Sequence, residues 1–313
     1  MSDPLAVIAE LPGVPEAVKE AREAVDTLYR HRVLRRRSPE VSAESALRGA
    51  RASAALEGVE VALGSLRAGE SDDPLVQGAL RVSAELGRLG PTWRTAPRQV
   101  LARLHTLAAA DLTPYLGRPR TTLPTSPPPS APPASAVSDQ NAPERGGLES
   151  AGEAPRGMDP LGLGEAPGAT DPFGLREVPR GTDPLGLGEA PGPEEMAIRM
   201  DGLIGLLMGK TAAPAVVLAA VVHAELAVLR PFGTADGLVA RAAERLTLVE
   251  FGLDPKSLVA VEAGHHELPY ADSLHAYLTG TPTGVAQWLR HCATAVTLGV
   301  REITAVCEAL QRG

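Results

Sequence analysis

The sequence predicts an all-α protein whose helices form one bundle, interrupted by a long insertion. Apolar residues recur at helical spacing through most of the chain, strand-like alternation is almost absent, and residues 118–195 shift to Pro, Gly, Ser and Ala. A segment of that composition buries too little apolar surface to fold alone. We therefore expect N-terminal helices of one domain in residues 1–117, a disordered linker in residues 118–195 and the core of the same domain in residues 196–313.

Prolines open several of the helical patterns, as is common at the first position of a helix. Residues 214–229 are apolar on nearly all sides, which is typical of the central helix of a bundle, and Pro231 ends this helix because proline cannot continue it. In chain order, we expect helices at residues 15–28, 42–59, 74–86, 97–107, from 195 onward, 214–229, 238–251, 269–278 and 283–310.

The bulk composition excludes several classes of protein. With 313 residues and a net charge of −8, the chain suits one ordinary domain plus an insertion, and the lack of a long Lys/Arg run gives no indication of nucleic-acid binding. The apolar run at residues 212–229 contains His223 and Glu225, so a core helix is favoured over a membrane span. Cys292 and Cys307 lie about 22 Å apart along one predicted helix, too far for a disulfide. With an N-terminus unlike a signal peptide, this predicts a cytoplasmic protein.

The insertion contains a tandem repeat with a spacing of twelve residues. Residues 159–167 read Asp-Pro-Leu-Gly-Leu-Gly-Glu-Ala-Pro, residues 171–179 read Asp-Pro-Phe-Gly-Leu-Arg-Glu-Val-Pro, and the repeat returns at residues 183–191. We interpret it as a disordered loop that grew by duplication. The alternative is that each Leu-Gly-Leu or Phe-Gly-Leu docks on a partner protein.

The segment after the central helix has the physical features of an anion site. Residues 230–241 read Arg-Pro-Phe-Gly-Thr-Ala-Asp-Gly-Leu-Val-Ala-Arg. A tight Gly-containing loop leads directly into a helix, where free N–H groups and the positive end of the helix dipole meet. Arg241, one turn into that helix, would add a bidentate donor for phosphate. An ordinary corner between two helices, with a surface arginine, is the alternative from this loop alone.

The same segment resembles the catalytic motif of the Fic/Doc (Fido) family, H-P-F-x-D/E-G-N-G-R-x-x-R. Pro231, Phe232, Gly237 and Arg241 match it. The resemblance implies a Fic-type helical bundle, and a site that binds ATP or another nucleotide with Mg²⁺ and modifies a protein target. The family's flap, which holds the target, is expected within the insertion.

A second motif, on an N-terminal helix, strengthens the resemblance. Ser53-Ala-Ala-Leu-Glu57-Gly58 is similar to the S/T-x-x-x-E-G/N inhibitory motif of many Fic proteins. In the family its Glu pairs with the last Arg of the catalytic motif and blocks the place of the ATP γ-phosphate. The resemblance therefore implies a regulatory role for Ser53, Glu57 and Gly58, with Glu57 and Arg241 forming an internal clamp.

The departures from the family motif remove its chemistry. Arg230 stands at the position of the His that deprotonates the target hydroxyl, and a guanidinium has no lone pair with which to do so. Thr234 replaces the acidic residue that holds Mg²⁺. We predict a degenerate member that lacks AMP transfer and binds a nucleotide or phosphate through a set of loop and helix residues: Gly233, Thr234, Ala235, Asp236, Gly237 and Arg241.

Two other functions are left open by these departures. Leu238 replaces the family's first Arg and removes a phosphate donor, while Asp236 would repel phosphate unless it holds the metal. An active transferase with a noncanonical site, using Asp236 on the metal, is the first alternative. A scaffold whose repeats bind partners is the second.

The remaining histidines are interpreted structurally. His265-His266 followed by Glu267 is expected in a solvated loop, with no metal site, because adjacent residues do not face one ion. We expect His223 to be a hydrogen-bonded core histidine, and a replacement base is the alternative.

Overall fold

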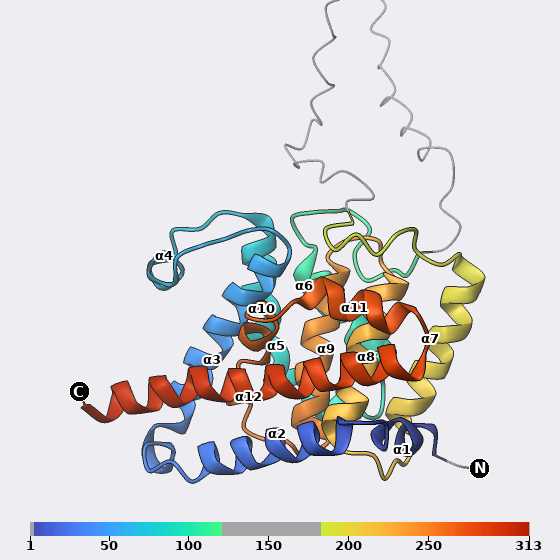
Figure 1. The fold of residues 1–313 in the computed structure, drawn as a ribbon. Helices are drawn as coiled ribbons and strands as arrows, with labels where there is room; N and C mark the ends of the chain where they lie inside the picture. Colours follow the sequence, from blue (N-terminus) through green and yellow to red (C-terminus); the bar gives the residue numbers. More distant parts are fainter. Residues whose placement is uncertain (1–2, 121–182, 313) are drawn as a thin grey trace, which may run out of the picture. The chain divides into compact units, whose positions relative to one another are not determined.

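The computed structural model describes residues 3–120 and 183–312, and in these residues the protein is all-α (Figure 1). This confirms the predicted fold class. The described part of the chain forms twelve helices and no strand. The helices before the gap are α1 (Pro4–Ala9), α2 (Val14–Tyr29), α3 (Leu34–Leu56), α4 (Leu63–Ala68), α5 (Pro74–Trp93) and α6 (Pro97–Ala108). Those after it are α7 (Pro193–Met208), α8 (Ala215–Leu229), α9 (Asp236–Glu250), α10 (Val261–His266), α11 (Tyr270–Leu278) and α12 (Pro282–Arg312).

Helix α8 lies within the bundle, as its apolar sequence predicts. Of its fifteen residues, only Glu225 is not buried, and the helix packs against α1, α7, α9, α11 and α12. The Glu225 carboxylate is itself paired, since it accepts hydrogen bonds from Arg199 on α7 at 2.9 and 3.1 Å and from the Tyr277 hydroxyl on α11 at 2.8 Å. The one residue of the central helix that is not buried is therefore paired with side chains of α7 and α11.

The long helix α12 packs against helices from both sides of the gap in the described residues. Figure 1 shows it running beside α2, and it also packs against α10 and α11. Cys292 and Cys307 are both buried on this helix as free cysteines. None of the helices in the described residues is long and apolar enough to cross a membrane.

The C-terminal end of the expected insertion, from residue 183 onward, is described by the structure and packs against the helical bundle. The repeat copies at residues 159–167 and 171–179 lie outside the described residues, as does most of the place where a Fic flap is expected. The third copy, residues 183–191, is described, and its Leu185 and Leu187 pack against the core. Helix α7 begins two residues later, at Pro193.

Candidate functional site

The connection between α8 and α9 is a sharply turned loop. Helix α8 is capped by Arg230, whose φ is 44°, and the loop has two more left-handed residues, Gly233 (φ 74°) and Ala235 (φ 52°). A left-handed conformation costs a non-glycine residue roughly 1–2 kcal/mol, so the surrounding contacts must hold Arg230 and Ala235 in place. Such strain tends to collect at functional loops.

Arg120 fixes the start of this loop. Its backbone N–H donates to Pro231 O at 2.6 Å, while its side chain donates to Arg230 O at 2.7 Å and to Leu229 O at 2.8 Å. These carbonyls lie at the C-terminal end of α8, where a cation is favoured by the helix dipole. Sequence reasoning missed this residue, because Arg120 lies at the edge of the Pro/Gly-rich segment, far along the chain from α8.

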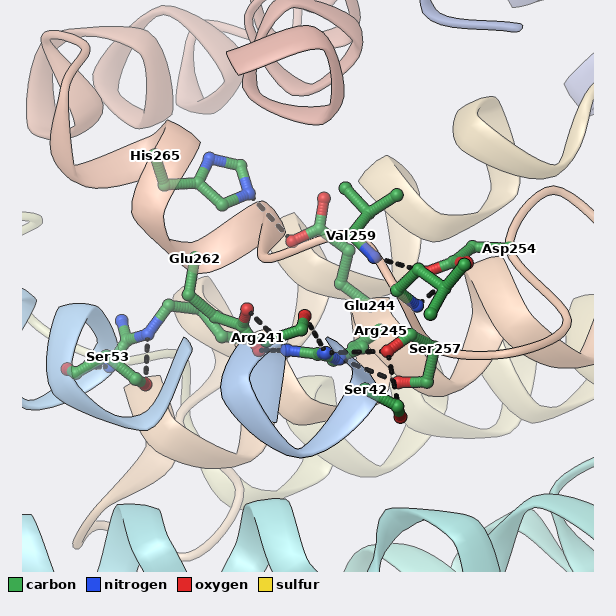
Figure 2. Close-up of polar contacts among 12 residues, drawn as sticks. Ser42, Ser53, Arg241, Glu244, Arg245, Asp254, Ser257, Val259, Glu262 and His265 are labelled. Carbon is green, nitrogen blue, oxygen red and sulfur yellow. Dashed lines mark hydrogen bonds and ion pairs between the residues drawn. The ribbon is translucent and has the colours of Figure 1, made fainter. Parts of the chain in front are cut away.

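Arg241 and the N-terminal motif meet as the sequence predicts. Arg241 is fully buried; its Nε donates to Ser53 Oγ at 2.8 Å, and its Nη2 donates to Ser53 O at 3.0 Å and to Glu57 Oε1 at 2.6 Å. Figure 2 shows Ser53 reaching Arg241. Glu57 is the C-cap of α3, and Gly58 follows it with φ 88°, so the glycine ends the helix where the carboxylate turns toward α9.

Gly237 lets the Glu57 carboxylate lie against the first turn of α9. A Cβ at position 237 would stand 2.0 Å from Glu57 Oε1 and 3.1 Å from Arg241 Nη1, so a side chain there would displace the Glu57 carboxylate. Arg241 Nη1 is buried and has no hydrogen-bond partner within the described residues. The guanidinium thus stands at a helix N-terminus, beside an internal carboxylate and near Tyr270, whose ring centroid lies 6.0 Å from Arg241 Cζ.

Asp236 provides a second internal carboxylate in the same loop. It is 6% exposed, and its Oδ1 accepts from the Phe232 N–H at 2.9 Å. Burial raises the pKa of Asp236 to about 7, while the backbone N–H groups of Phe232 and Gly233 act in the opposite direction. The backbone N–H groups of Phe232 and Gly233 therefore already interact with a carboxyl group of the protein. Thr234 and Ala235 lie half-buried in the same loop, and Leu238 is buried in the core.

Arg230 is held by the third repeat copy. Its Nη2 donates to Gly188 O, and its Nη1 lies 3.9 Å from Asp183 Oδ1. Both partners belong to residues 183–191, which pass over the loop at this point. The arginine at the start of the motif is therefore engaged with the chain itself.

Comparison with known proteins identifies the fold. No family model matches the chain, and no curated protein matches it by sequence. Among solved structures, the chain is similar to a Fic family protein from Desulfovibrio desulfuricans G20, with a TM-score of 0.60, 16% sequence identity, and coverage of 93% of this chain and 74% of that chain. The chain has the Fic fold.

Within this Fic fold, His105 lies beside the motif. Its ring stacks on Phe232 with centroids 4.3 Å apart, and its Nδ1 accepts from the Gly117 N–H at 2.9 Å. The Nε2 must then carry the proton, and burial lowers the pKa of His105 to about 4. A ring whose acceptor nitrogen is already occupied is a poor replacement base.

Behind Arg241, a buried network joins the five helices α8 to α12. Glu244 Oε2 lies 2.7 Å from His223 Nδ1. It also lies 2.7 Å from His265 Nε2, as Figure 2 shows. The outer nitrogens of the two rings meet Tyr270 Oη at 2.7 Å and His291 Nε2 at 3.0 Å. His223 is a hydrogen-bonded core histidine, as expected.

The expectation for His265 was wrong. It lies on α10, fully buried, instead of in a solvated loop. Only the neighbouring His266 faces outward, toward Glu60 at 3.1 Å. Sequence reasoning treated the pair as one feature, although adjacent residues of a helix point in different directions. The available signal was the charged pair Glu244-Arg245 between the apolar residues Ala243 and Leu246 of α9, which indicates buried polar partners.

This network has the ligand types of a metal site but the geometry of direct hydrogen bonds. His223, Glu244 and His265 offer two imidazoles and a carboxylate from three helices. At 2.7 Å, however, the carboxylate oxygen and each ring nitrogen share a proton directly. Burial lowers the pKa of His223 to about 4, and burial alone would raise that of Glu244, but the two imidazoles hold it below its ordinary value. We therefore describe it as a hydrogen-bonded network that supports α9.

A second buried pair fixes the same helix one residue further on. Arg245 Nη1 donates to Glu262 Oε2 at 3.0 Å, and its Nη2 donates to Ser45 Oγ at 2.6 Å. A Cβ at Gly49 would lie 2.6 Å from both members of the pair, so the glycine on α3 makes room for it. Arg241 and Arg245 lie on successive turns of α9, and together they tie this helix to Ser53 and Ser45 of α3.

An apolar groove borders the loop through Phe232. It has a volume of about 560 Å³ and lies between α6 and α7, with Leu101, Met196 and Met200 among its lining residues. Ligand sites are commonly apolar hollows with a few polar groups at the edge. The loop thus borders an apolar groove at Phe232 and the Glu57–Arg241 pair at Gly237.

Proposed function

We propose that this Fic-fold protein binds the phosphate of a nucleotide at the N-terminus of α9, in competition with Glu57, and does not transfer AMP. The observation that carries the proposal is the buried Nη1 of Arg241, which lacks a partner within the described residues and stands beside Gly237. An unpaired buried donor is costly. A phosphate oxygen at this point would satisfy it and would also meet the free N–H groups of the helix.

The lack of transfer rests on Arg230 and its contacts. A guanidinium does not accept a proton, and this one is tied to Gly188 O. Loss of a general base alone costs about 10²–10⁴ in rate. The nearby imidazole of His105 has its acceptor nitrogen bound to the Gly117 N–H. Thr234, at the metal position of the motif, offers a hydroxyl, which is a weaker ligand for Mg²⁺ than a carboxylate.

The binding proposal is tested by calorimetry with ATP, ADP, UDP, GTP and CDP-choline, each with Mg²⁺. Glu57→Gln keeps the size of the side chain and removes the charge that competes with phosphate, so we expect it to raise affinity about tenfold or more. Glu60→Gln is the matched control, because the Glu60 side chain is 62% exposed and meets Arg51 and His266 instead. A Glu57→Gln protein that binds none of these ligands would refute phosphate binding.

The loss of transfer is tested separately with labelled ATP and either Mg²⁺ or Mn²⁺. We expect no label on the protein itself or on proteins of a lysate, in the wild type and in Glu57→Gln alike. Label that appears in the wild type and disappears in Asp236→Ala would favour an active transferase that uses Asp236 on the metal. A protein that neither binds nor transfers a nucleotide would favour a scaffold.

A further inference from the structure

Helix α7 presents an exposed apolar face. Its buried side chains lie on one side, where the helix packs against α6 and α8 at the edge of the bundle (Figure 1). On the opposite side, Ile198 is 66% exposed and Met208 is 57% exposed. Val7 is 63% exposed on α1, a helix tied to the end of α7 because its N-cap Asp3 accepts from Thr211 Oγ1 at 2.8 Å. The three most exposed large apolar side chains of the described residues thus lie on α7 or on the helix bound to its end, and such a grouping marks an interaction surface.

Two glycines lie on this face between the exposed apolar side chains. Gly202 and Gly205 follow Ile198 by four and seven residues, so the three positions share one side of the helix. A Cβ at either glycine would meet no atom within 4 Å. Glycine inside a helix costs stability relative to alanine, and no contact within the described residues requires it at these positions. The missing side chains leave the backbone of α7 open to close approach by another helix.

The two ends of the face carry opposite charges. Glu194 lies eight residues before Gly202, and Lys210 lies eight residues after it. Both are exposed, and neither forms an ion pair within the described residues. Asp201, next to Gly202, is paired with Arg98 of α6, so the centre of the face carries no net charge. The charge pattern is therefore complementary to its own reverse: an antiparallel copy of the helix brings opposite charges together at both ends, whereas a parallel copy brings like charges together.

We propose that the outer face of α7 is a self-association surface, and that its occupant is α7 of a second copy of this chain, which crosses in the antiparallel direction at Gly202. The same patch is used on both copies, so each contact occurs twice. Ile198 of each copy lies over Gly205 of the other, and Glu194 meets Lys210. One pair of crossing helices buries less than about 1,000 Å² in total, so the chain is a monomer in dilute solution and dimerises at high concentration. This association is independent of nucleotide binding.

The test measures the dissociation constant of the full chain by sedimentation equilibrium, from micromolar to millimolar concentration. Ile198→Asp places an unpaired carboxylate in the interface twice, and Gly205→Gln holds the two backbones apart. We expect each change to weaken association at least about tenfold. Because glutamine is a better helix former than glycine, Gly205→Gln should leave the monomer no less stable. Leu278→Asp is the control, since Leu278 is 39% exposed on α11, outside this face, and we expect it to leave association unchanged.

Exchange of charges tests the direction of the crossing. Glu194→Lys and Lys210→Glu should each weaken self-association about fivefold or more, because two attractive contacts become repulsive. An equal mixture of the two variants should associate about as tightly as the wild type. In the mixed dimer, position 194 of each chain again faces a charge of opposite sign at position 210 of the other.

Each result supports or overturns the proposal. A chain that stays monomeric at every concentration refutes it. Association that Ile198→Asp leaves unchanged, or that Leu278→Asp weakens equally, places the interface elsewhere. A mixture of the charge variants that associates no better than either variant alone refutes the antiparallel crossing. Circular dichroism of every variant checks that the helical body is intact.

Discussion

Arg241 carries its charge on a side chain that is 0% exposed, and Glu57, the carboxylate that pairs with it, is 12% exposed. Taking one partner from a buried ion pair leaves the other charge uncompensated in a medium of low dielectric constant. Because Arg241 is the more deeply buried of the two, the loss of its partner should strongly lower the free energy of unfolding. The clamp is thus a stability element as well as a candidate regulatory one.

We predict that Glu57→Ala lowers the free energy of unfolding by about 3–5 kcal/mol. Glu57→Gln should cost less than half as much, because the amide oxygen still accepts from Arg241. Urea denaturation followed by circular dichroism measures both, and Glu267→Ala is the control, since its pair with Arg301 lies at the surface with exposed fractions of 40% and 66%. A Glu57→Ala protein as stable as the control would show that the pair contributes little.

Asp236 should make stability depend on pH in a direction opposite to that of most carboxylates. Its pKa is raised by burial to about 7, above the ordinary value of 3.8. Folding therefore favours the protonated form, so this residue's contribution is best below about pH 4, declines between pH 4 and 7, and stays unfavourable above that range.

We predict that Asp236→Asn raises the free energy of unfolding at pH 8 by a few kcal/mol, relative to its effect at pH 4. The Asn side chain still offers an oxygen to the Phe232 N–H. Melting curves of both proteins from pH 4 to pH 8 give the difference. A constant difference across this range would mean that Asp236 is ionised in the folded protein throughout.

At the scale of helices, the position of His265 depends on how closely α10 approaches α12. A Cβ at Gly264 would stand 1.9 Å from Ala295 O, which is a backbone atom that cannot turn aside. Since His265 follows directly and meets Glu244, any separation of the two helices disturbs the network behind Arg241. The glycine therefore connects helix packing with the site.

We predict that Gly264→Ala destabilises the protein by at least about 2 kcal/mol, through overpacking. Gly202→Ala on α7 is the matched control: it adds the same methyl group within a helix, but no atom lies within 4 Å of the new Cβ. This change should stabilise by about 0.5–1 kcal/mol, because alanine loses less freedom on folding. Equal effects of the two changes in denaturant titrations would contradict close packing at Gly264.

The helices that the sequence predicted well share a local cause. Pro74 and Pro97 begin α5 and α6 as expected, because proline at the first turn leaves no hydrogen bond unmade. The six-residue helices α1, α4 and α10 were missed, since one and a half turns display too little periodicity to be recognised. His265 lies on α10, so the missed helix added to the error of treating the two adjacent histidines as one feature.

The contacts of the site are likewise of two kinds: those that local motifs predict and those that depend on how distant helices pack. The contact between Glu57 and Arg241 could be anticipated from two motifs, although 184 positions separate the residues. The roles of Arg120 and Glu244 could not, because each depends on the angle at which distant helices pack. The seating of residues 183–191 also escaped prediction, since a Pro/Gly-rich composition indicates disorder unless a matching surface is known.

At the scale of the whole molecule, the two ends of the sequence share one core. Helices α2 and α3 pack against α12 and α10, while α5 packs against α9. We propose that residues 1–117 and 196–313 are one folding unit, as the sequence analysis expected, since neither part covers its own apolar faces. The two tryptophans of the chain allow this to be tested directly.

Each tryptophan reports on a different region of that core. Trp93 on α5 donates to Thr247 Oγ1 on α9 at 3.0 Å, and Trp288 on α12 donates to Ala220 O on α8 at 2.8 Å. Both side chains are fully buried. Trp93→Phe and Trp288→Phe therefore give two proteins, each with one fluorescent probe at a known place.

We predict that each single-tryptophan protein unfolds in urea in one transition whose fluorescence midpoint coincides with its midpoint by circular dichroism. The physical reason is that α5 cannot leave α9 without exposing the apolar faces that α8, α9 and α12 share. If the Trp93 signal changes at a lower urea concentration than the helical signal of the same protein, the N-terminal helices unfold separately and the single-unit proposal fails. Glu57 would then be released from Arg241 before the core opens, so such a result would also predict nucleotide binding by a partly unfolded state.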